Sequence, residues 1–174
     1  MDETAKKNAL RMIPYGLYLV GARDPGASDP ATALNAFVGS WVTQTSFKPP
    51  MLVVCVRADS RSNRWIRESG ALTLNVLGSH QKELAQRFFK DVVVEPASAT
   101  EGTMSGVPYR IEPKTGCPVF PDAVAWVACE VEAVLDGGDV VPDHTPFLVR
   151  VVDAGYRGPD KPLTKEETGW VYAG

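Results

Sequence analysis

Short apolar runs separated by clusters of turn residues dominate the pattern of this chain. Runs of this kind cover residues 15–22, 33–45, 51–57, 71–77, 123–136 and 147–152. Asp24-Pro25-Gly26 and Gly137-Gly138 are typical of the turns between them. Apolar and polar residues alternate along 123–136, whereas 51–57 is almost wholly apolar, so we expect the latter strand to be buried on both faces. The pattern therefore predicts about six or seven strands.

Helical patterns are fewer and shorter. They cover residues 2–12, 63–68 and 80–90, with Ser60 or Ser62 as the cap of the second and Ser79 as the cap of the third. We expect 91–118 to be mostly loop and 170–172 to form a short terminal strand. Because helices do not alternate regularly with strands, a doubly wound parallel sheet is disfavoured. The prediction is a mainly β fold, an antiparallel Greek-key barrel with a few short helices.

Composition narrows the class of protein. The chain has 174 residues, of which 44% are hydrophobic and 22% charged, and this size favours a single domain over 1–174. The net charge of −3 argues against a nucleic-acid or anionic-membrane partner. Its three cysteines are odd in number and show no C-x-x-C spacing, which disfavours a disulfide framework. With no signal peptide or membrane span visible, we expect a cytoplasmic protein.

The first candidate site is the strand-like run that begins near Asn35. Its small or hydroxylic residues let a ligand approach the backbone closely, and unpaired N–H and C=O groups at a barrel edge suit the polar edge of a flat ring. These residues are Gly39, Ser40, Thr43, Thr45 and Ser46. The alternative is an ordinary barrel strand whose hydroxyls face water.

The second candidate site is the polar cluster that follows the buried run 51–57. Two serines, the first amides of a helix and nearby arginines together form an anion site suited to phosphate. The cluster comprises Arg57, Ser60, Arg61, Ser62, Asn63 and Arg64. The alternative is a capped helix with a solvated basic face, which the spacing of Arg61, Arg64 and Arg67 also fits.

Histidine offers little further chemistry. Asp143-His144 lies in a loop-like segment, where a histidine is often only a polar loop residue. No Cys/His/carboxylate cluster has metal-ligand spacing, so we expect no metal site. The sequence also contains no G-x-S-x-G elbow, no P-loop and no G-x-G-x-x-G after a strand. A nicotinamide nucleotide, if used, would not be bound in the Rossmann manner.

Residues 10–152 resemble the flavin reductase-like, FMN-binding split-barrel family, which includes flavoredoxins and reductase components of two-component monooxygenases. The matching segments, in chain order, are Asn35-Ala36, Ser40-Trp41 through Ser46, Phe47-x-Pro49-Pro50, Leu52 to Val56, Ala58-Asp59-Ser60-x-Ser62-Asn63, Glu68-Ser69-Gly70, Leu74-Asn75-Val76-Leu77, Cys129-Glu130-Val131 and Asp143-His144 with Phe147-Leu148-Val149. Their order and spacing together make the resemblance fairly specific.

The resemblance implies a homodimer of six-stranded antiparallel Greek-key split β-barrels with flavin near the subunit interface. The segment that would line the isoalloxazine and ribityl chain comprises Asn35, Gly39, Ser40, Trp41, Val42, Thr43 and Thr45. The residues that would hold the phosphate are Arg57, Ser60, Arg61, Ser62 and Asn63. His144 would lie on the nicotinamide side of the flavin. The cofactor would be FMN, or FAD, with NAD(P)H as a transient co-substrate.

The implied activity is flavin reduction, in which a hydride passes from NAD(P)H to the flavin and onward to an acceptor or a redox partner protein. A flavoredoxin-like electron carrier without NAD(P)H activity is the main alternative, and a pyridoxal-phosphate or haem-related member of the fold group fits less well. Pro142 stands where the family usually has Gly before Asp-His, and Thr145-Pro146 is rearranged. The C-terminal tail also lacks the common Y-x-G-G-x-Y ending. These departures bear on nicotinamide use more than on flavin binding.

Overall fold

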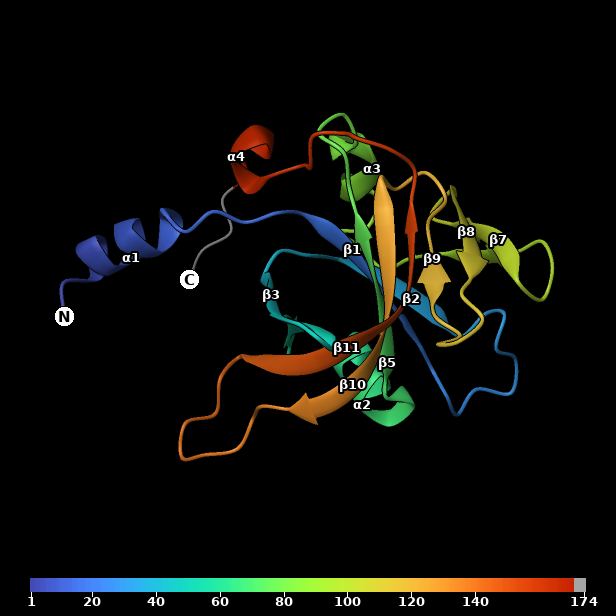
Figure 1. The fold of residues 1–174 in the computed structure, drawn as a ribbon, viewed down its shortest axis with the longest axis horizontal. Helices are drawn as coiled ribbons and strands as arrows, with labels where there is room; N and C mark the ends of the chain where they lie inside the picture. Colours follow the sequence, from blue (N-terminus) through green and yellow to red (C-terminus); the bar gives the residue numbers. More distant parts are fainter. Residues whose placement is uncertain (171–174) are drawn as a thin grey trace.

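The computed structural model describes residues 1–170, and Figure 1 shows their arrangement. The four helices of this part are α1 (Glu3–Arg11), α2 (Arg61–Ser69), α3 (Lys82–Gln86) and α4 (Lys165–Thr168). The strands of the larger sheet are β1 (Tyr18–Arg23), β2 (Leu34–Gly39), β3 (Val42–Phe47), β4 (Pro50–Arg57), β5 (Ala71–Val76), β10 (Ala125–Val134) and β11 (His144–Tyr156). The strands of the smaller sheet are β6 (Val94–Pro96), β7 (Glu101–Met104), β8 (Val107–Ile111) and β9 (Pro118–Val119).

The larger sheet has seven strands in the order β2-β1-β5-β10-β11-β4-β3, and every neighbouring pair is antiparallel. The mainly β, antiparallel prediction is therefore confirmed. The six-stranded split barrel is wrong in its strand count, because the larger sheet has seven strands and a second sheet of four strands is present, and the edge strands β2 and β3 do not pair to close a barrel. Short strands rich in Pro and Gly, such as β9, carry too weak a pattern to be predicted.

The predicted long strand over 33–45 is two strands, broken at Ser40-Trp41. Since β2 and β3 lie at opposite edges of the larger sheet, the chain must leave one edge at Gly39 and join the other at Val42. No continuous strand can do this, so the tertiary fold overrides the local β pattern. The break brings the two edges of a strongly curved sheet together at one corner.

The segment 91–118, predicted to be mostly loop, lies for the larger part outside strands, but it also contains most of the smaller sheet, which was not predicted (Figure 1). The predicted helix over 80–90 is much shorter: α3 begins after Gln81, and Ser79 does not cap it. Phe88 then lies in the core, 3% exposed, whereas Phe89 is 55% exposed. The helix over 2–12 is confirmed as α1, which leads away from the sheets in Figure 1.

Helix α2 forms where the sequence predicts it. The Ser60 hydroxyl accepts a hydrogen bond from the amide of Asn63 at 3.1 Å, and Gly70 ends the helix with φ of 66°. Trp65 and Ile66 lie on its buried face. A hydroxyl cap at one end and a left-handed glycine at the other thus fix both limits of the helix.

Two apolar clusters hold the fold together. One lies between the sheets and α3, and includes Phe88, Met104 and Phe120. The other fills the curve of the larger sheet beneath α2, and includes Ile66 and Phe147. The run 51–57 is less buried than expected: Val54 and Val56 enter the second cluster, but the alternate residues of β4 are half-buried. One face of β4 is thereby left for other contacts.

The C-terminal segment returns along the start of β1. Leu17 donates to the carbonyl of Leu163 and Lys165 donates to that of Tyr15, both at 2.9 Å. This pairing places Trp170 beside Phe89, with ring centroids 4.6 Å apart. Trp170 itself is in neither helix nor strand, and the rest of the strand expected over 170–172 falls outside the described residues.

Candidate functional site

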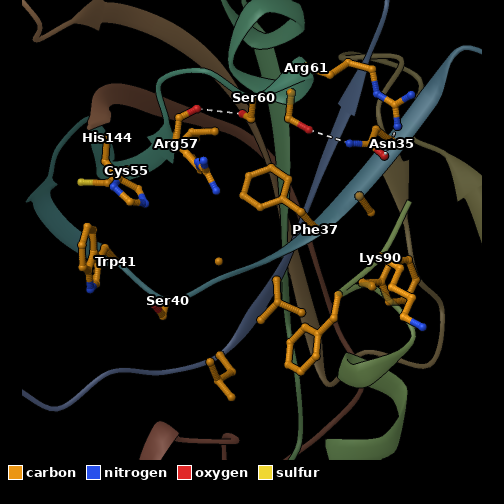
Figure 2. Close-up of a pocket in the computed structure, with 18 of the residues that line it drawn as sticks. Asn35, Phe37, Ser40, Trp41, Cys55, Arg57, Ser60, Arg61, Lys90 and His144 are labelled. Atoms are coloured by element: carbon orange, nitrogen blue, oxygen red, sulfur yellow. Dashed lines mark hydrogen bonds between the residues drawn. The ribbon is translucent and has the colours of Figure 1, made fainter. Parts of the chain in front are cut away.

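A large cavity opens between β2, the start of α2, β4 and the segment after α3 (Figure 2). Its volume is about 1080 Å³. The residues that line it are Leu17, Asn35, Ala36, Phe37, Val38, Gly39, Ser40, Trp41, Cys55, Val56, Arg57, Ser60, Arg61, Ser62, Phe88, Phe89, Lys90, Asp91, His144, Lys165 and Trp170. Segments from both halves of the sequence therefore share one site, and it lies where the corner between β2 and β3 meets the helix.

One wall of the cavity is the first turn of α2. Ser60, Arg61 and Ser62 all line it, so these three residues of the predicted anion site border one space. The N-terminus of a helix carries unpaired backbone N–H groups and a partial positive charge, which favour a bound anion. This wall suits a phosphate group.

Asn35 connects that wall to β2. Its side-chain amide donates to the Ser62 hydroxyl at 2.7 Å, and its carbonyl oxygen accepts from the Arg61 guanidinium at 3.1 Å. Asn35 is only 9% exposed. Asn35 lines the cavity, as the prediction that it lines the flavin site requires, and its side chain also positions Arg61 and Ser62.

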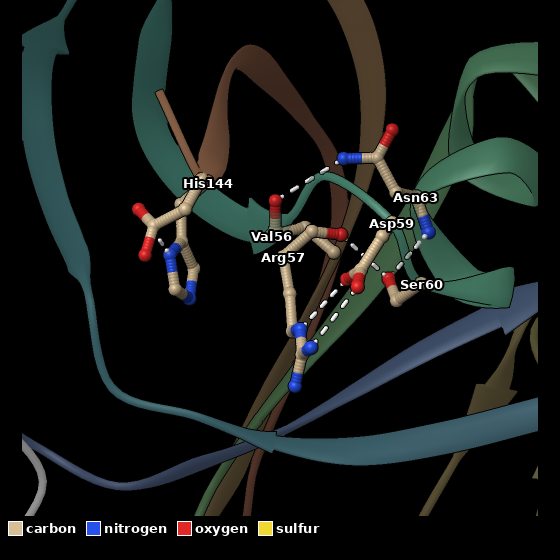
Figure 3. A network of polar contacts seen from close by, with 7 residues as sticks. Val56, Arg57, Asp59, Ser60, Asn63 and His144 are labelled. Carbon is tan, nitrogen blue, oxygen red and sulfur yellow. Dashed lines mark hydrogen bonds and ion pairs between the residues drawn. The ribbon is translucent and has the colours of Figure 1, made fainter. Parts of the chain in front are cut away.

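Arg57 lies at the end of β4, where it forms a two-point ion pair with Asp59 (Figure 3). The Nε–Oδ1 distance is 2.6 Å and the second contact is 3.0 Å. The hydrogen bond from Arg57 holds the pKa of the Asp59 carboxyl below its usual range. Part of the positive charge of Arg57 is thus balanced within the protein.

The opposite end of the cavity is aromatic. The rings of Trp41 and His144 lie 4.5 Å apart at a tilt of 56°, and Cys55 is beside them in Figure 2. His144 Nδ1 lies 3.1 Å from the carboxylate of Asp143, and that hydrogen bond lowers the pKa of Asp143. His144 pairs with Arg57 across β11 and β4. The histidine is therefore part of a strand and a ring wall, not of a free loop.

Gly39 and Ser40 line the cavity at the break between β2 and β3. A Cβ atom on Gly39 would lie 2.8 Å from the Val20 side chain, so packing against β1 requires glycine there. The small residues of this corner leave the backbone open to the cavity. At Gly39, the absence of a side chain is required by the neighbouring strand β1.

Four of the residues that the family resemblance assigns to the site do not line the cavity, namely Val42, Thr43, Thr45 and Asn63, and neither do the candidates Ser46 and Arg64. The two threonines are exposed on β3, which has turned away from the cavity after the break. Asn63 lies behind the wall, where its amide donates to the Val56 carbonyl at 3.1 Å (Figure 3). It ties α2 to β4.

Several cavity residues were missed by the sequence reasoning. Phe37, Phe89, Lys90, Lys165 and Trp170 all contribute to the lining. The last two lie far along the chain from the anion site and reach it only through the pairing of the C-terminal segment with the start of β1. The aromatic pair Phe88-Phe89, flanked by Arg87 and Lys90, was visible in the sequence, but nothing local connected it to residues 35–62.

The lining is positively charged although the protein is not. It contains four Lys or Arg residues and a single carboxylate, that of Asp91, whereas the whole chain has a net charge of −3. Among residues 1–170, no cluster of His, Cys, Asp and Glu could hold a metal ion. Low dielectric walls focus such a charge imbalance, so the cavity favours an anionic organic ligand.

Within the same range, no helix is long and apolar enough to cross a bilayer. The cysteines of the chain are free: Cys117 and Cys129 are buried, and Cys55 is half-buried in the cavity wall. These thiols behave as small apolar residues in the fold.

Comparison with known proteins identifies relatives over almost all of this structure. The flavin reductase like domain matches residues 10–169. A flavin reductase (NADH) from Kitasatospora aureofaciens is 36% identical over 152 residues, which cover 83% of this chain and 68% of that protein. The stachydrine N-demethylase reductase subunit Stc3 from Rhizobium meliloti is 27% identical over 140 residues, or 80% of this chain and 55% of that protein.

A solved structure gives the same fold. The styrene monooxygenase flavin reductase from Pseudomonas putida S12 superposes with a TM-score of 0.69 at 22% identity, over 94% of this chain and 93% of that one. The chain spans 38% and 55% of the lengths of two curated relatives from Rhizobium meliloti. The match over residues 10–169 shows that this chain belongs to the flavin reductase-like family.

Proposed function

We propose that this protein is an FMN-binding flavin reductase, in which hydride passes from NAD(P)H to flavin and then to an acceptor. The observation that carries the proposal is the cavity itself: the start of α2, with Arg61 and Ser62 held by Asn35, faces the same space as the Trp41–His144 wall. A phosphate site and a flat aromatic site at opposite ends of one cavity fit a flavin nucleotide.

The residues present fit that cofactor. Ser60, Arg61 and Ser62 would hold the phosphate, with Arg57 close by, and the Gly39-Ser40 corner would give the ring access to backbone groups. Val42, Thr43, Thr45 and Asn63 would support the flavin site from outside the cavity, since they do not line it. When bound, the flavin accepts a hydride and passes its reducing equivalents on.

The chain's own contribution is binding and orientation. Trp41 and His144 form a wall at the flavin-ring end of the cavity, where a nicotinamide ring would stack on the flavin, and Asp143 orients the histidine through its Nδ1. The buried Asn35 amide fixes Arg61, so that the anion site is preorganised before a ligand arrives. Hydride transfer between two stacked rings requires no protein nucleophile.

Anaerobic spectroscopy tests this function directly. Purified protein should bind FMN, and addition of NADH or NADPH should bleach the flavin absorbance. Failure to bind FMN or FAD overturns the proposal. Binding without bleaching by either nicotinamide rejects the reductase and leaves the flavoredoxin-like carrier.

We also infer a homodimer. The loop between β10 and β11 projects from the body of the fold in Figure 1 and carries Val140 and Val141, which are 80% and 88% exposed. Phe47, at the turn between β3 and β4, is 85% exposed. Apolar side chains this exposed support an interface with a second copy.

Light scattering after gel filtration tests the dimer. The expected mass is twice the 18.8 kDa of the chain. Val141→Asp should shift the population to monomer, whereas the matched change Val93→Asp, at a 63% exposed position just before β6, should not. A monomeric wild-type protein would contradict the inference.

Three further expectations belong to this proposal. A redox partner protein would receive the reduced flavin or its electrons; a relative from Rhodococcus opacus is the reductase component of a 4-nitrophenol 4-monooxygenase/4-nitrocatechol 2-monooxygenase. A cytoplasmic location is supported by the unpaired cysteines. The single domain over 1–174 is supported by the family match.

A further inference from the structure

Arg67 joins three elements of the fold from a position outside the cavity. It lies in the last turn of α2, where its spacing from Arg61 and Arg64 suits a solvated basic face. Its side chain is nevertheless only 38% exposed, and it takes part in three polar contacts. Because Arg67 does not line the cavity, these contacts do not hold a ligand directly. Their partners show what they support.

The first contact supports the wall at the start of α2. Arg67 Nε donates to the side-chain oxygen of Asn63 at 2.8 Å, and the amide of Asn63 donates to the Val56 carbonyl at 3.1 Å (Figure 3). Asn63 is 2% exposed and directly follows Ser62, which lines the cavity. A buried amide that is hydrogen-bonded at both ends is fixed in orientation. Arg67 therefore helps to position the first turn of α2 against β4.

The second contact reaches the strand that carries the aromatic wall. Arg67 Nη2 donates to the Thr145 hydroxyl at 3.2 Å, and the guanidinium carbon lies 5.7 Å from the centre of the Phe147 ring. Thr145 and Phe147 are 2% and 0% exposed. Thr145 directly follows His144 on β11. One cation thus contacts the immediate neighbours of residues at both ends of the cavity.

The third contact reaches the loop between β10 and β11, which projects from the body of the fold in Figure 1. The same nitrogen of Arg67 donates to the carboxylate of Asp136, near the start of this loop. At the end of the loop, the Asp143 carbonyl accepts from the amide of Ala58 at 2.9 Å, between β4 and α2. Both ends of the loop are therefore attached beside the anion site, whereas its middle is exposed.

The geometry of the guanidinium links these three contacts. Its donors are fixed in one plane, so the contacts cannot shift independently of one another. If the loop moves Asp136 away, Arg67 loses the carboxylate that balances and orients its charge, and its contacts with Asn63 and Thr145 weaken as well. A group held in common by a surface loop and a binding site is what energetic coupling between the two requires.

We propose that Arg67 is a positioning residue that couples the β10–β11 loop to flavin binding. With Asp136 in place, Arg67 holds Asn63 and Thr145 so that the two ends of the cavity keep the spacing that a flavin nucleotide needs. A second copy of this chain seated on the loop would thereby change the affinity for flavin. The assignment rests on the proposed function, since it concerns the control of the same cavity.

The Kd for FMN of Asp136→Ala, measured by fluorescence titration, is the first test. Asp136 does not line the cavity, yet its loss should raise the Kd roughly two- to five-fold, as expected for a partly exposed ion pair. Asp139→Ala removes the same charge from the same loop. Since Asp139 forms no ion pair within residues 1–170, this control should leave the Kd unchanged. Both positions are exposed, so neither substitution threatens folding.

A double-mutant cycle tests whether Arg67 carries the effect. Arg67→Met should raise the Kd for FMN about ten-fold, because the contacts with Asn63 and Thr145 are lost as well. Adding Asp136→Ala to Arg67→Met should raise the Kd no further. Arg67→Lys, which keeps the charge but not the planar fork, should restore part of the affinity, and it takes the place of Arg67→Met if urea unfolding shows that variant to be unfolded.

An unchanged Kd in Asp136→Ala overturns the proposal, and so does an equal effect of Asp139→Ala. Additive effects of Asp136→Ala and Arg67→Met overturn it too, because the loop would then act by another route. The Kd values are compared at a protein concentration where light scattering gives variants and wild type the same mass, so that a change in assembly is not counted as coupling. Failure of the proposed function is a separate result, namely no FMN binding by wild type.

Discussion

The side-chain amide of Asn35 donates a hydrogen bond of 2.7 Å to the hydroxyl of Ser62, and it thereby joins β2 to the first turn of α2. The same side chain accepts from Arg61 at 3.1 Å. One buried amide thus couples the strand that leads into the corner at Ser40 to the helix start that faces the cavity. The anion site depends on a residue that does not itself need to touch the ligand.

Asn35→Ala should therefore weaken FMN binding by about ten-fold, because Arg61 and Ser62 lose their common support and a buried hydrogen bond is left unmade. Fluorescence quenching of FMN on titration measures this. Gln44→Ala, which removes an exposed amide from β3, is the control and should leave the Kd unchanged. Equal effects of the two changes would contradict the role given to Asn35.

Substitutions of two arginines of α2 should have very different effects on the affinity for FMN. Arg61 lines the cavity, whereas Arg64 is 65% exposed and faces Glu68 at 4.0 Å. Arg61→Ala should raise the Kd for FMN by about ten-fold or more, as expected for a charge-assisted hydrogen bond of about 1.5–3 kcal/mol. It should have little effect on riboflavin, which lacks the phosphate. Arg64→Ala should affect neither ligand, and a similar loss for both ligands in Arg61→Ala would refute the phosphate assignment.

The three cysteine thiols should be alkylated at very different rates. Burial raises the pKa of Cys117 and Cys129 to about 12, and it also raises that of Cys55, which nevertheless lines the cavity. The thiolate is the reactive form, so alkylation of Cys55 should be slow at neutral pH and accelerate as the pH rises toward its pKa. Iodoacetamide followed by mass spectrometry should modify Cys55 alone in the folded protein.

FMN should protect Cys55 from this reaction, because the ligand would cover that part of the wall. Modification of Cys55 at the same rate with and without saturating FMN would place the flavin elsewhere. Urea-unfolded protein, in which all three thiols become accessible, serves as the reference for complete labelling.

The ion pair of Arg57 and Asp59 should be detectable in an acid titration as a lowered pKa of Asp59. The Arg57 hydrogen bond depresses the pKa of Asp59 below 3.8, so the pair contributes above the unfolded-state pKa and is lost as the pH falls through the folded-state value. In Arg57→Gln the pKa of Asp59 should rise toward its ordinary value. NMR titration of the carboxyl carbon measures the shift, and an unchanged pKa would show that the pair does not persist in solution.

Asn75 should matter for stability more than for binding. Its amide donates to the Leu19 carbonyl at 3.0 Å and its oxygen accepts from the Phe120 amide at 2.9 Å, and the residue is fully buried. Asn75→Leu should lower the free energy of unfolding by about 1–3 kcal/mol, because the Phe120 N–H loses its acceptor. Urea unfolding measures the loss. Asn8→Leu on exposed α1 is the control, and a comparable loss there would argue against the proposed cause.

Much of the local structure could be predicted from the sequence. Ser60 and Gly70 delimit α2 because a hydroxyl cap and a left-handed residue act within a few positions of the chain. The turns at Gly and Pro, which separate the major strands, could be predicted for the same reason, because these residues also act within a few positions of the chain. Short strands with Pro and Gly, as in β6 to β9, carry no such signal, since only their partners stabilise them.

The candidate site was predictable only in part. The wall formed by Ser60, Arg61 and Ser62 is contiguous in sequence, so its hydroxyl and basic residues could be recognised from the sequence alone. The orientation of Thr43 and Thr45 was not predictable, because it depends on the turn of the chain between opposite edges of one sheet. Trp170 reaches the cavity through backbone hydrogen bonds such as that between Leu17 and Leu163, which no local pattern encodes.

The sequence by itself determined the antiparallel, mainly β class, the capped helix with its basic first turn, and the resemblance to the flavin reductase-like family. These depend on hydrophobic periodicity, capping and local spacing, which act over a few residues. Only the tertiary structure decided that Asn35 supports Arg61, that β3 turns away, and that Phe89, Lys90 and Trp170 share the cavity with them. Those relations arise from long-range strand pairing, whose geometry is set by the packing of the whole sheet.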